Sequence, residues 1–417
     1  MTRRDLLISL LLGLGLAVVL VAGALLLPRG TGEPSAPISD PAPVQQEEDR
    51  ALLGVWAASV GNLDFPSRPD LTADELKNEL DDLIDRTAQW GMNAVFLQVR
   101  PCADALYASG IFPVSSYLSS SRELPDGFDP LTYAVERAHA KGIEVHAWVN
   151  PLRVSTKDAL EDLPESSPAR QHPDWVVSYA DGCLYWNPGV EGVRALVADG
   201  VGEILENYAV DGIHFDDYFY PYPQGDAAFA DEEAFAASGG EKSLAEWRRE
   251  NVTALIRAVS ERIRSIDERA AFGVAPFAVW QNASSDPQGS PTAAGIETYS
   301  DLYADTRAWV QEGLLDYICP QIYWTRSQPG VEFETVYDWW EKTVDQTGVK
   351  LLAGHAFYKA GREEYGWDDP EEIAAQVRLI RERERYGGSV FYRYALLRDD
   401  QTGAREALCR ALQEKST

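Results

Sequence analysis

Residues Val210–Pro221 have the sequence VDGIHFDDYFYP, and this stretch decides how the rest of the chain is interpreted. Its first half is short and apolar, with Ile213 and Phe215 alternating with other residues, which is typical of a buried strand. The strand ends in two adjacent carboxylates, Asp216 and Asp217. Aspartate is depleted in strands and costly to bury, so we expect this strand to deliver both side chains to a functional site. The alternative, that the pair only caps the strand or binds a cation, is still open here.

The sequence on both sides of this stretch repeats one pattern from Ala51 onward: an apolar strand, a polar loop, an amphipathic helix and a glycine, at intervals of roughly 35–60 residues. The predicted strands are Leu53–Ala58, Ala94–Val99, Glu144–Asn150, Val210–Asp216, Ala271–Ala275, Tyr317–Ile322, Leu351–His355 and Ser389–Tyr392. The predicted helices are Thr72–Trp90, Pro130–Lys141, Val190–Tyr208, Leu244–Ile266, Ser300–Glu312, Glu332–Gln346, Pro370–Arg385 and Thr402–Gln413. This alternation predicts an α/β fold of the (β/α)8 TIM barrel type, and a doubly wound open sheet is the alternative.

Several helix ends carry local signals. Thr72 with Glu75 predicts a capping box, and Asp129–Pro130 and Asp369–Pro370 each predict a cap followed by a first-turn proline. Four glycines stand between a helix and the next strand and are predicted to be left-handed helix caps: Gly91, Gly142, Gly313 and Gly348.

The loops are long on one side of the predicted barrel only. Helix-to-strand connections are very short, whereas long strand-to-helix connections span Arg100–Asp129, Pro151–Gly189, Tyr218–Ser243 and Pro276–Tyr299. Active sites of such barrels lie at the C-terminal ends of the strands, where these long loops are. We therefore expect the site at that rim.

The side chains that follow the strand ends are the candidate site residues. Asp216 is the first candidate for a catalytic carboxylate, with Asp217 or Asp104 as the second acid or base. Because side chains alternate along a strand, Asp216, His214 and Tyr218 are predicted to face the barrel mouth and Asp217 to face outward or into the loop. The candidate substrate-binding residues are Asn62, Asp64, Arg100, His146, Asn150, His214, Tyr218, Trp280, Gln321, Tyr323, Trp324 and His355. Other side chains follow strand ends without an assigned role, namely Gln98, Trp148, Arg153, Tyr358, Tyr392 and Arg393.

This set of side chains is suited to a carbohydrate: it has amides and carboxylates for hydroxyl groups, aromatic rings for sugar faces, and few positive charges. Hydrolysis of a glycosidic bond typically uses two carboxyl groups, one protonated and one ionised. Two competing hypotheses are a barrel that binds glycan without catalysis and a metal-dependent hydrolase using His146, His214, Asp216 and His355. No HxH or HxxE spacing supports metal binding, so no metal is predicted. The histidines at 146 and 214 also fit hydrogen-bonded core residues.

The composition restricts the kinds of partner that the protein can bind. The formal net charge is −29, which argues against nucleic acid as a partner. The four cysteines are scattered, without a CxxC pair. In an exported protein Cys102 and Cys183, which both lie in predicted loops, are candidates for a disulfide.

The N-terminus differs from the rest of the chain. The apolar run Leu6–Leu27 is long enough to cross a bilayer, so residues 1–28 are predicted to be a transmembrane anchor, with a cleaved signal segment as the alternative. Residues 29–50 are rich in Pro, Ser, Glu and Gln and predict a disordered linker. Residues 51–417 are then one barrel domain outside the cytoplasm, tied to the membrane or secreted.

The chain from Leu53 to about Tyr394 resembles the bacterial glycosyl hydrolase-like 10 family of the YngK type. The stretches that carry the resemblance are Gly54–Trp56, Asn62–Ser67, Asn93–Pro101, Asp104–Tyr107, Gly142–Pro151, Val210–Pro221, Phe272–Phe277 with Trp280, Leu302–Asp305 and Pro320–Trp324. The resemblance implies a cell-envelope glycosidase that hydrolyses O-glycosyl bonds (EC 3.2.1.-), with peptidoglycan glycan strands as substrate and no cofactor.

The chain also has a more distant likeness to chitinase-type barrels, whose fourth strand follows the pattern D-G-x-D-x-D-x-E. An aspartate of that pattern falls on Asp216, but the glutamate that acts as the general acid falls on Tyr218. The chitinase mechanism is therefore not transferred to this chain.

Overall fold

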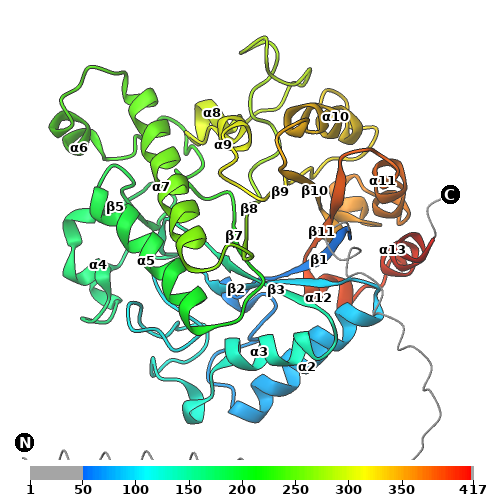
Figure 1. The fold of residues 1–417 in the computed structure, drawn as a ribbon, viewed down its shortest axis with the longest axis horizontal. Coiled ribbons are helices and arrows are strands. Elements are labelled where there is room, and N and C mark those ends of the chain that lie inside the picture. The colour runs from blue at the N-terminus through cyan, green and yellow to red at the C-terminus, as the bar shows by residue number, and fades with distance from the viewer. Residues whose placement is uncertain (1–49, 415–417) are drawn as a thin grey trace, which may run out of the picture. The chain divides into compact units, whose positions relative to one another are not determined.

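The computed structural model describes residues 50–414. The predicted membrane segment at residues 1–28 lies outside the described residues, as does the predicted linker except for its last residue. Within the described part, parallel strands close into a barrel in the order β1-β11-β10-β9-β8-β7-β3-β2 (Figure 1). These strands are β1 Leu52–Ala57, β2 Ala94–Arg100, β3 Glu144–Val149, β7 Gly212–Phe215, β8 Ala271–Val274, β9 Tyr317–Ile318, β10 Lys350–His355 and β11 Tyr386–Tyr392. The predicted (β/α)8 barrel is confirmed.

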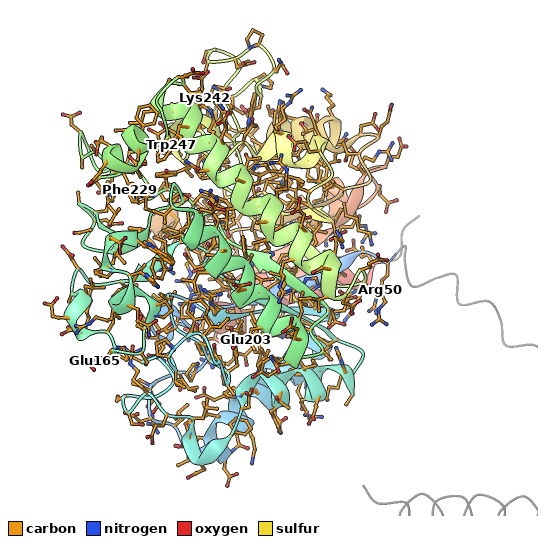
Figure 2. All side chains as sticks on the ribbon, turned by 60° about the vertical axis from the view of Figure 1, so that its left-hand side comes forward. Arg50, Glu165, Glu203, Phe229, Lys242 and Trp247 are labelled. Atoms are coloured by element: carbon orange, nitrogen blue, oxygen red, sulfur yellow. The ribbon has the colours of Figure 1, made fainter. Side chains whose placement is uncertain are left out.

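Helices surround the barrel on its outside (Figure 1). They are α2 Ala73–Gln89, α3 Pro130–His139, α4 Pro168–Gln171, α5 Glu191–Asn207, α6 Glu232–Ala237, α7 Leu244–Ile266, α8 Thr298–Asp301, α9 Thr306–Gln311, α10 Phe333–Val344, α11 Glu372–Ile380, α12 Tyr394–Arg398 and α13 Ala404–Gln413. Helices α5 and α7 run side by side along one flank (Figure 2). Among residues 50–414, no helix is both long and apolar enough to cross a membrane.

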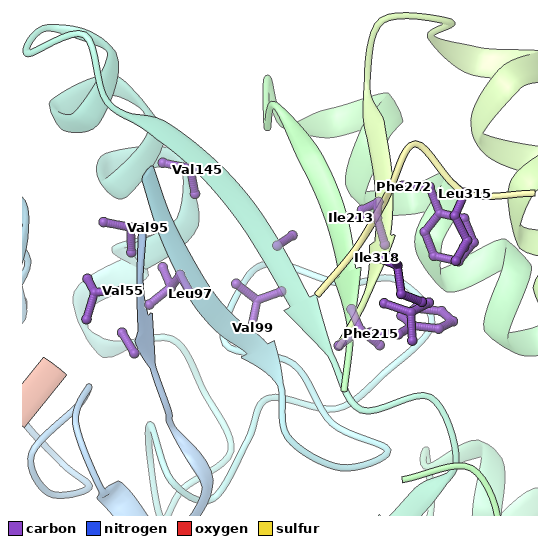
Figure 3. Packing of buried hydrophobic residues seen from close by; sticks show 14 of the residues in the cluster. Val55, Val95, Leu97, Val99, Val145, Ile213, Phe215, Phe272, Leu315 and Ile318 are labelled. Carbon is purple, nitrogen blue, oxygen red and sulfur yellow. The ribbon is translucent and has the colours of Figure 1, made fainter. Parts of the chain in front are cut away.

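The strands separate two apolar layers. Residues that point away from the barrel axis, such as Val55, Val95 and Ile213, pack into one large core (Figure 3). Residues of the opposite parity, such as Phe96 and Tyr317, fill the barrel interior in a second cluster. This two-sided burial explains why the strands are apolar on both faces.

Glycines make room for the large aromatic side chains inside the barrel. A Cβ atom on Gly273 would collide with the Tyr317 ring, and one on Gly212 would collide with His146. The interior is therefore filled by rings from some strands packed against bare backbone from their neighbours, as close packing of a barrel requires.

Most local signals in the sequence are confirmed. Thr72 and Glu75 form the predicted capping box of α2, and the Asp129 side chain caps α3 in front of Pro130. All four predicted glycine caps have a positive φ angle, between 66° at Gly313 and 81° at Gly91.

Three predicted elements differ from the structure. The strand predicted to reach Ile322 ends at Ile318, because Pro320 cannot donate to a neighbouring strand and only isolated bridges continue beyond it. The helix predicted from Ser300 is two short helices, and Tyr303 between them has a φ of 51°. Asp369 does not cap a helix, because α11 begins at Glu372.

The long loop after β3 contains a small sheet that the sequence did not predict. Its strands β4 Arg153–Ser155, β5 Val176–Ser178 and β6 Leu184–Trp186 pair antiparallel in the order β4-β6-β5. Because β4 begins only four residues after β3 ends, this sheet places Arg153 directly at the barrel mouth.

Gly273→Ala tests whether the interior needs this close packing. We expect the variant to lose about 1–3 kcal/mol of unfolding free energy, because the added methyl group must displace the Tyr317 ring. Urea unfolding followed by fluorescence measures the loss. The control is Gly295→Ala, which places a methyl group in open space and should leave the midpoint unchanged. Equal midpoints for both variants would contradict this description of the interior.

Candidate active site

A pocket of about 210 Å³ opens at the C-terminal ends of the strands. Its wall consists of Trp56, Val60, Gln98, Trp148, Arg153, His214, Asp216, Asp217, Tyr218, Ala275, Gln321, Tyr323, Tyr358 and Tyr392. Six residues predicted as catalytic or substrate-binding line this one pocket: His214, Asp216, Asp217, Tyr218, Gln321 and Tyr323. Carboxyl groups thus face a concave surface rich in aromatic rings, which is the arrangement expected for a sugar site.

Asp216 is the most tightly held carboxyl group in the pocket. It is 5% exposed, and its Oδ2 accepts hydrogen bonds from Trp148 Nε1 at 3.0 Å and Asn150 Nδ2 at 3.1 Å. The Tyr218 backbone N–H donates to the other oxygen, Oδ1, at 3.3 Å. Burial, reinforced by the charge of Asp217, raises the pKa of Asp216 to about 7. This carboxyl group therefore gains and loses a proton near neutral pH, as an acid or base catalyst requires.

Asp217 lines the same pocket, which corrects the prediction that it faces outward or into the loop. The alternation rule does not apply to it because β7 ends at Phe215, before the two aspartates. The Tyr222 hydroxyl donates a hydrogen bond to Asp217 Oδ2. Burial raises the pKa of Asp217, while hydrogen bonds from Tyr222 and Gln321 oppose the rise.

A chain of hydrogen bonds runs from the pocket wall into the barrel. Trp56 Nε1 donates to His214 Nε2 at 3.0 Å, and the Tyr317 hydroxyl lies 3.0 Å from His214 Nδ1 and 3.1 Å from His146 Nδ1. An indole N–H can only donate, so neutral His214 carries its proton on Nδ1 and donates it to Tyr317. Tyr317 in turn donates to His146, whose Nε2 lies 3.3 Å from Glu144 Oε2. Burial lowers the pKa of His214 well below its usual value, which keeps it neutral.

Two further polar side chains of the wall bear on binding. Arg153 donates from Nε and Nη2 to the Pro101 carbonyl at 3.1 and 3.0 Å, and its guanidinium group lies over the Tyr218 ring. Gln98 accepts the Ser59 and Val60 N–H groups, at 3.0 and 2.9 Å. Its Nε2 is buried without a hydrogen-bond partner in the described part of the chain.

Two predicted binding residues do not line the pocket but are linked by hydrogen bonds, directly or through one other residue, to the side chains that do. Asn150 contacts Asp216 and accepts the Arg153 N–H at 2.8 Å. His146 lies in the network beneath the floor and does not line the pocket. Both are buried, so they orient other groups.

Two predicted residues after β1 hold loops together. The Asn62 amide donates to the Pro66 and Tyr117 carbonyls, and Asp64 pairs with Arg393 at 2.7 Å. Asp64 also accepts the Ala58 and Ala395 N–H groups. The structure brings neither side chain into the pocket.

Arg100 and Asp104 lie away from the pocket as well. A register shift between Gln98 and Arg100 turns the arginine aside, and its guanidinium group stacks over the Phe112 ring at 3.7 Å. Asp104 lies 3.6 Å from Arg122 and lines a neighbouring pocket of about 250 Å³. The structure therefore does not bring Asp104 together with Asp216.

The last three predicted residues pack against other parts of the fold. Trp280 donates to Asp305 at 2.9 Å, and Trp324 packs against Phe277. His355 is bound by Gln376 at 2.9 Å and by Ser389 at 3.1 Å, and lies between the rings of Phe333 and Phe391.

The ligand set considered for a metal is not assembled. In the described part of the chain, no group of three or more His, Cys, Asp or Glu side chains stands close enough to hold a metal ion. The cysteines at 102 and 183, the candidates for a disulfide, are both free thiols.

Several pocket residues had no predicted role. Gln98, Trp148, Arg153, Tyr358 and Tyr392 stood among the side chains after strand ends, where a stricter use of parity would have selected Trp148 with Asn150. Trp56 and Tyr222 were not among the predicted site residues. Trp56 lies one residue before the end of β1 with inward parity, a signal available in the sequence, whereas the loop path that brings Tyr222 to Asp217 left no sequence signal.

Comparison with known proteins decides the family. Residues 51–369 match the family described as glycosyl hydrolase-like 10. The chain belongs to this family. It is a glycoside hydrolase, and the pocket at the barrel mouth is its candidate active site.

Named relatives and solved structures agree with this assignment. The enzyme is 39% identical to "Glycosyl hydrolase YngK" of Bacillus subtilis, over 91% of this chain and 75% of the relative. It is 37% identical to "Glycosyl hydrolase DigH" of Escherichia coli K12, over 92% of this chain and 93% of the relative. The PgaB (BpsB) glycoside hydrolase domain from Bordetella bronchiseptica matches with a TM-score of 0.57 and 14% identity, over 88% of this chain and 100% of that domain. At this identity the last likeness shows the shared fold alone.

The raised pKa of Asp216 predicts a pH-dependent stability that Asp216→Asn removes. The folded-state pKa of about 7 lies above the ordinary 3.8, so the folded protein holds this proton more tightly than the unfolded chain. The resulting stabilisation is complete below pH 4 and is lost as the pH rises through 7. We expect the unfolding free energy of Asp216→Asn, relative to wild type, to rise across this window by up to about 4 kcal/mol.

Urea unfolding at several pH values measures this difference. The control is Asp226→Asn, which changes an exposed aspartate in the loop that follows β7. The control should show no pH-dependent difference from wild type. A difference between Asp216→Asn and wild type that stays constant from pH 4 to 8 would contradict the assigned shift.

Proposed function

We propose that this enzyme hydrolyses the glycan strands of peptidoglycan outside the cytoplasm, using Asp216 and Asp217 as its catalytic carboxyl groups. The observation that carries the proposal is the pairing of these two carboxyl groups in one aromatic-lined pocket of a glycosyl hydrolase-like barrel. Burial raises the pKa of both groups, which suits a pair that has to donate and accept a proton.

The pocket wall supports a sugar as the ligand. Trp56, Trp148 and Tyr392 offer ring surfaces, and the Gln321 and Tyr323 side chains add polar groups. Arg153 is the only cationic side chain among the residues that line the pocket. Its charge lies beside Asp216 and lowers the pKa of that carboxyl group, against the larger effect of burial. The ring surfaces and hydrogen-bonding groups thus outnumber the charges, as expected for a substrate that presents hydroxyl and amide groups.

Products of glycan digestion test the activity. The full chain, incubated with purified peptidoglycan that is either intact or freed of peptides by an amidase, should create new sugar ends detectable by mass spectrometry. Asp216→Asn should lower the rate about 10²–10⁴-fold, since it removes an acid or base group. The amide is nearly isosteric with the carboxyl group, so the fold should survive.

Asp226→Asn serves as the matched control and should cleave at the wild-type rate. Binding of glycan without cleavage by wild type would instead favour the non-catalytic alternative. Cleavage of another polysaccharide in preference to peptidoglycan would overturn the proposed substrate. Wild-type activity in Asp216→Asn would overturn the proposed catalytic group.

The location outside the cytoplasm is supported by the sequence of residues 1–50, with its apolar run and its linker composition. Alkaline phosphatase fused after residue 50 should be active, because that reporter folds only after export to an oxidising compartment. An inactive fusion that accumulates in the cytoplasm would contradict the proposed location.

A further inference from the structure

The carboxyl groups of the site are arranged in a way that the usual glycosidase mechanisms do not use. We propose that the substrate carries a 2-acetamido group on the sugar whose bond is cleaved, and that this acetamido oxygen is the nucleophile. Asp216 orients the acetamido group, and Asp217 donates the proton to the leaving oxygen. This inference rests on the proposed glycosidase function and specifies how that same site works.

Asp216 and Asp217 are the only acidic residues among the described residues that line the pocket. They are consecutive in the chain, so their Cα atoms are about 3.8 Å apart and both side chains approach a bound sugar from one wall. The common mechanisms instead place two carboxyl groups on either side of the scissile bond, about 5–5.5 Å apart for retention and about 6.5–9.5 Å apart for inversion.

The wall across from the pair carries no acid. Around the closed barrel, β11 lies four strands from β7, directly opposite it, with β1 and β10 on either side of β11. The pocket residues from that side are Tyr392 on β11, Trp56 on β1 and Tyr358 just after β10. None of these side chains has a carboxyl group that could attack the sugar. None of them is a base that could activate a water molecule.

The nearest other acids considered for the site are already engaged elsewhere. Asp64 is fixed by Arg393 and by two backbone N–H groups. Asp104 lines the neighbouring pocket with Arg122. Since none of the residues that line the pocket supplies a carboxyl group from the opposite side, the attacking atom comes from the substrate itself. A 2-acetamido group has such an atom, because its carbonyl oxygen reaches the adjacent C1 in a five-membered ring.

The surroundings of the two carboxyl groups separate their roles. Asp216 is the deeper one and accepts three N–H donors, from Trp148, Asn150 and the backbone of Tyr218. These donors hold the Asp216 carboxyl group in place to accept from the acetamido N–H, whereas burial raises the pKa of Asp217, so this group, which is nearer to solvent, can carry the proton for the leaving oxygen.

The geometry of the wall matches these roles. Asp217 is half-buried and closer to solvent, where the leaving part of a glycan strand departs. The Tyr222 hydroxyl and Gln321 keep it in place. Asp216 lies beside the Trp148 ring, which offers an apolar surface for the acetamido methyl group.

The reaction balances in two steps. In the first, the acetamido oxygen forms a bond to C1 while the C1–O bond to the leaving sugar breaks, and the Asp217 proton passes to that oxygen. Asp216 accepts a hydrogen bond from the acetamido N–H and so stabilises the positive charge of the oxazolinium ring. In the second, water attacks C1, the ring opens, and Asp217 takes back a proton from the water. Two displacements at C1 leave its configuration retained.

A stable mimic of the ring intermediate tests the proposal without relying on turnover. The probe is an N-acetylated glycan disaccharide whose reducing sugar is fused as a 1,2-thiazoline, and its binding is followed by tryptophan fluorescence. Wild type should bind it at least 10²-fold more tightly than the parent disaccharide, as expected for a mimic of a high-energy state. Asp216→Asn should lose at least tenfold of that affinity, whereas the exposed control Asp226→Asn should bind like wild type.

Product stereochemistry and leaving-group dependence provide the second measurement. Proton NMR of the first product should show retained configuration at C1. Asp217→Asn should lose activity on glycan but retain much of it on an aryl glycoside of the same disaccharide, because an acidic phenol leaves without protonation. A residue needed only for folding would not give this split.

The outcomes separate this inference from the proposed function. If wild type cleaves the glycan but binds the thiazoline no more tightly than the disaccharide, or inverts C1, the acetamido mechanism is overturned while the glycosidase function stands. A covalent glycosyl-enzyme intermediate trapped on the protein would overturn it as well. If wild type cleaves no glycan at all, the proposed function fails and this inference fails with it.

Discussion

Burial of the Asp216 carboxyl group is the constraint on which the arrangement of the barrel mouth depends. A carboxylate that loses its water costs several kcal/mol unless donors replace that water. Trp148 and Asn150 on and just after β3 supply two such donors, and the Tyr218 backbone supplies a third. Because β3 and β7 are paired in register, Trp148 lies directly beside His214, and its indole reaches Asp216 two residues further on. Moving either strand by one residue would separate these partners and leave the charge unpaired.

The floor of the pocket is also held in place by hydrogen bonds and close packing. His214 is held between Trp56 from β1 and Tyr317 from β9, so strands that are not neighbours in the sheet are linked through one imidazole ring. The bare backbone of Gly212 and Gly273 admits the rings of His146 and Tyr317. These contacts fix the layer of side chains beneath the two carboxyl groups. A catalytic group must be held to within a fraction of an ångström to act. The cost is a buried network in which each polar atom needs its partner.

The sequence predicted the barrel, the rim and the central role of Val210–Pro221, because period, helix caps and loop lengths are local signals. Loops were harder: Asn62, Asp64 and Asp104 follow strand ends, yet the paths of their loops carry them to Pro66, Arg393 and Arg122. At two strand ends, the prediction that the side chain reaches the pocket was wrong for a physical reason. A register shift turns Arg100 aside, and His355 has the parity of the outer face, where it packs between Phe333 and Phe391. Asp217 was predicted to face outward or into the loop because the alternation of β7 was extended past its last residue, Phe215.

The central claim is that a sugar is cleaved between Asp216, Asp217 and the aromatic wall of this pocket. A crystal structure of Asp217→Asn soaked with an N-acetylated glycan fragment tests it most directly, since the variant should bind substrate and turn it over slowly. Our account predicts one sugar ring in the pocket, with its acetamido N–H within hydrogen-bonding distance of Asp216 and its glycosidic oxygen beside residue 217. A fragment bound on another surface while this pocket holds only water would contradict the account.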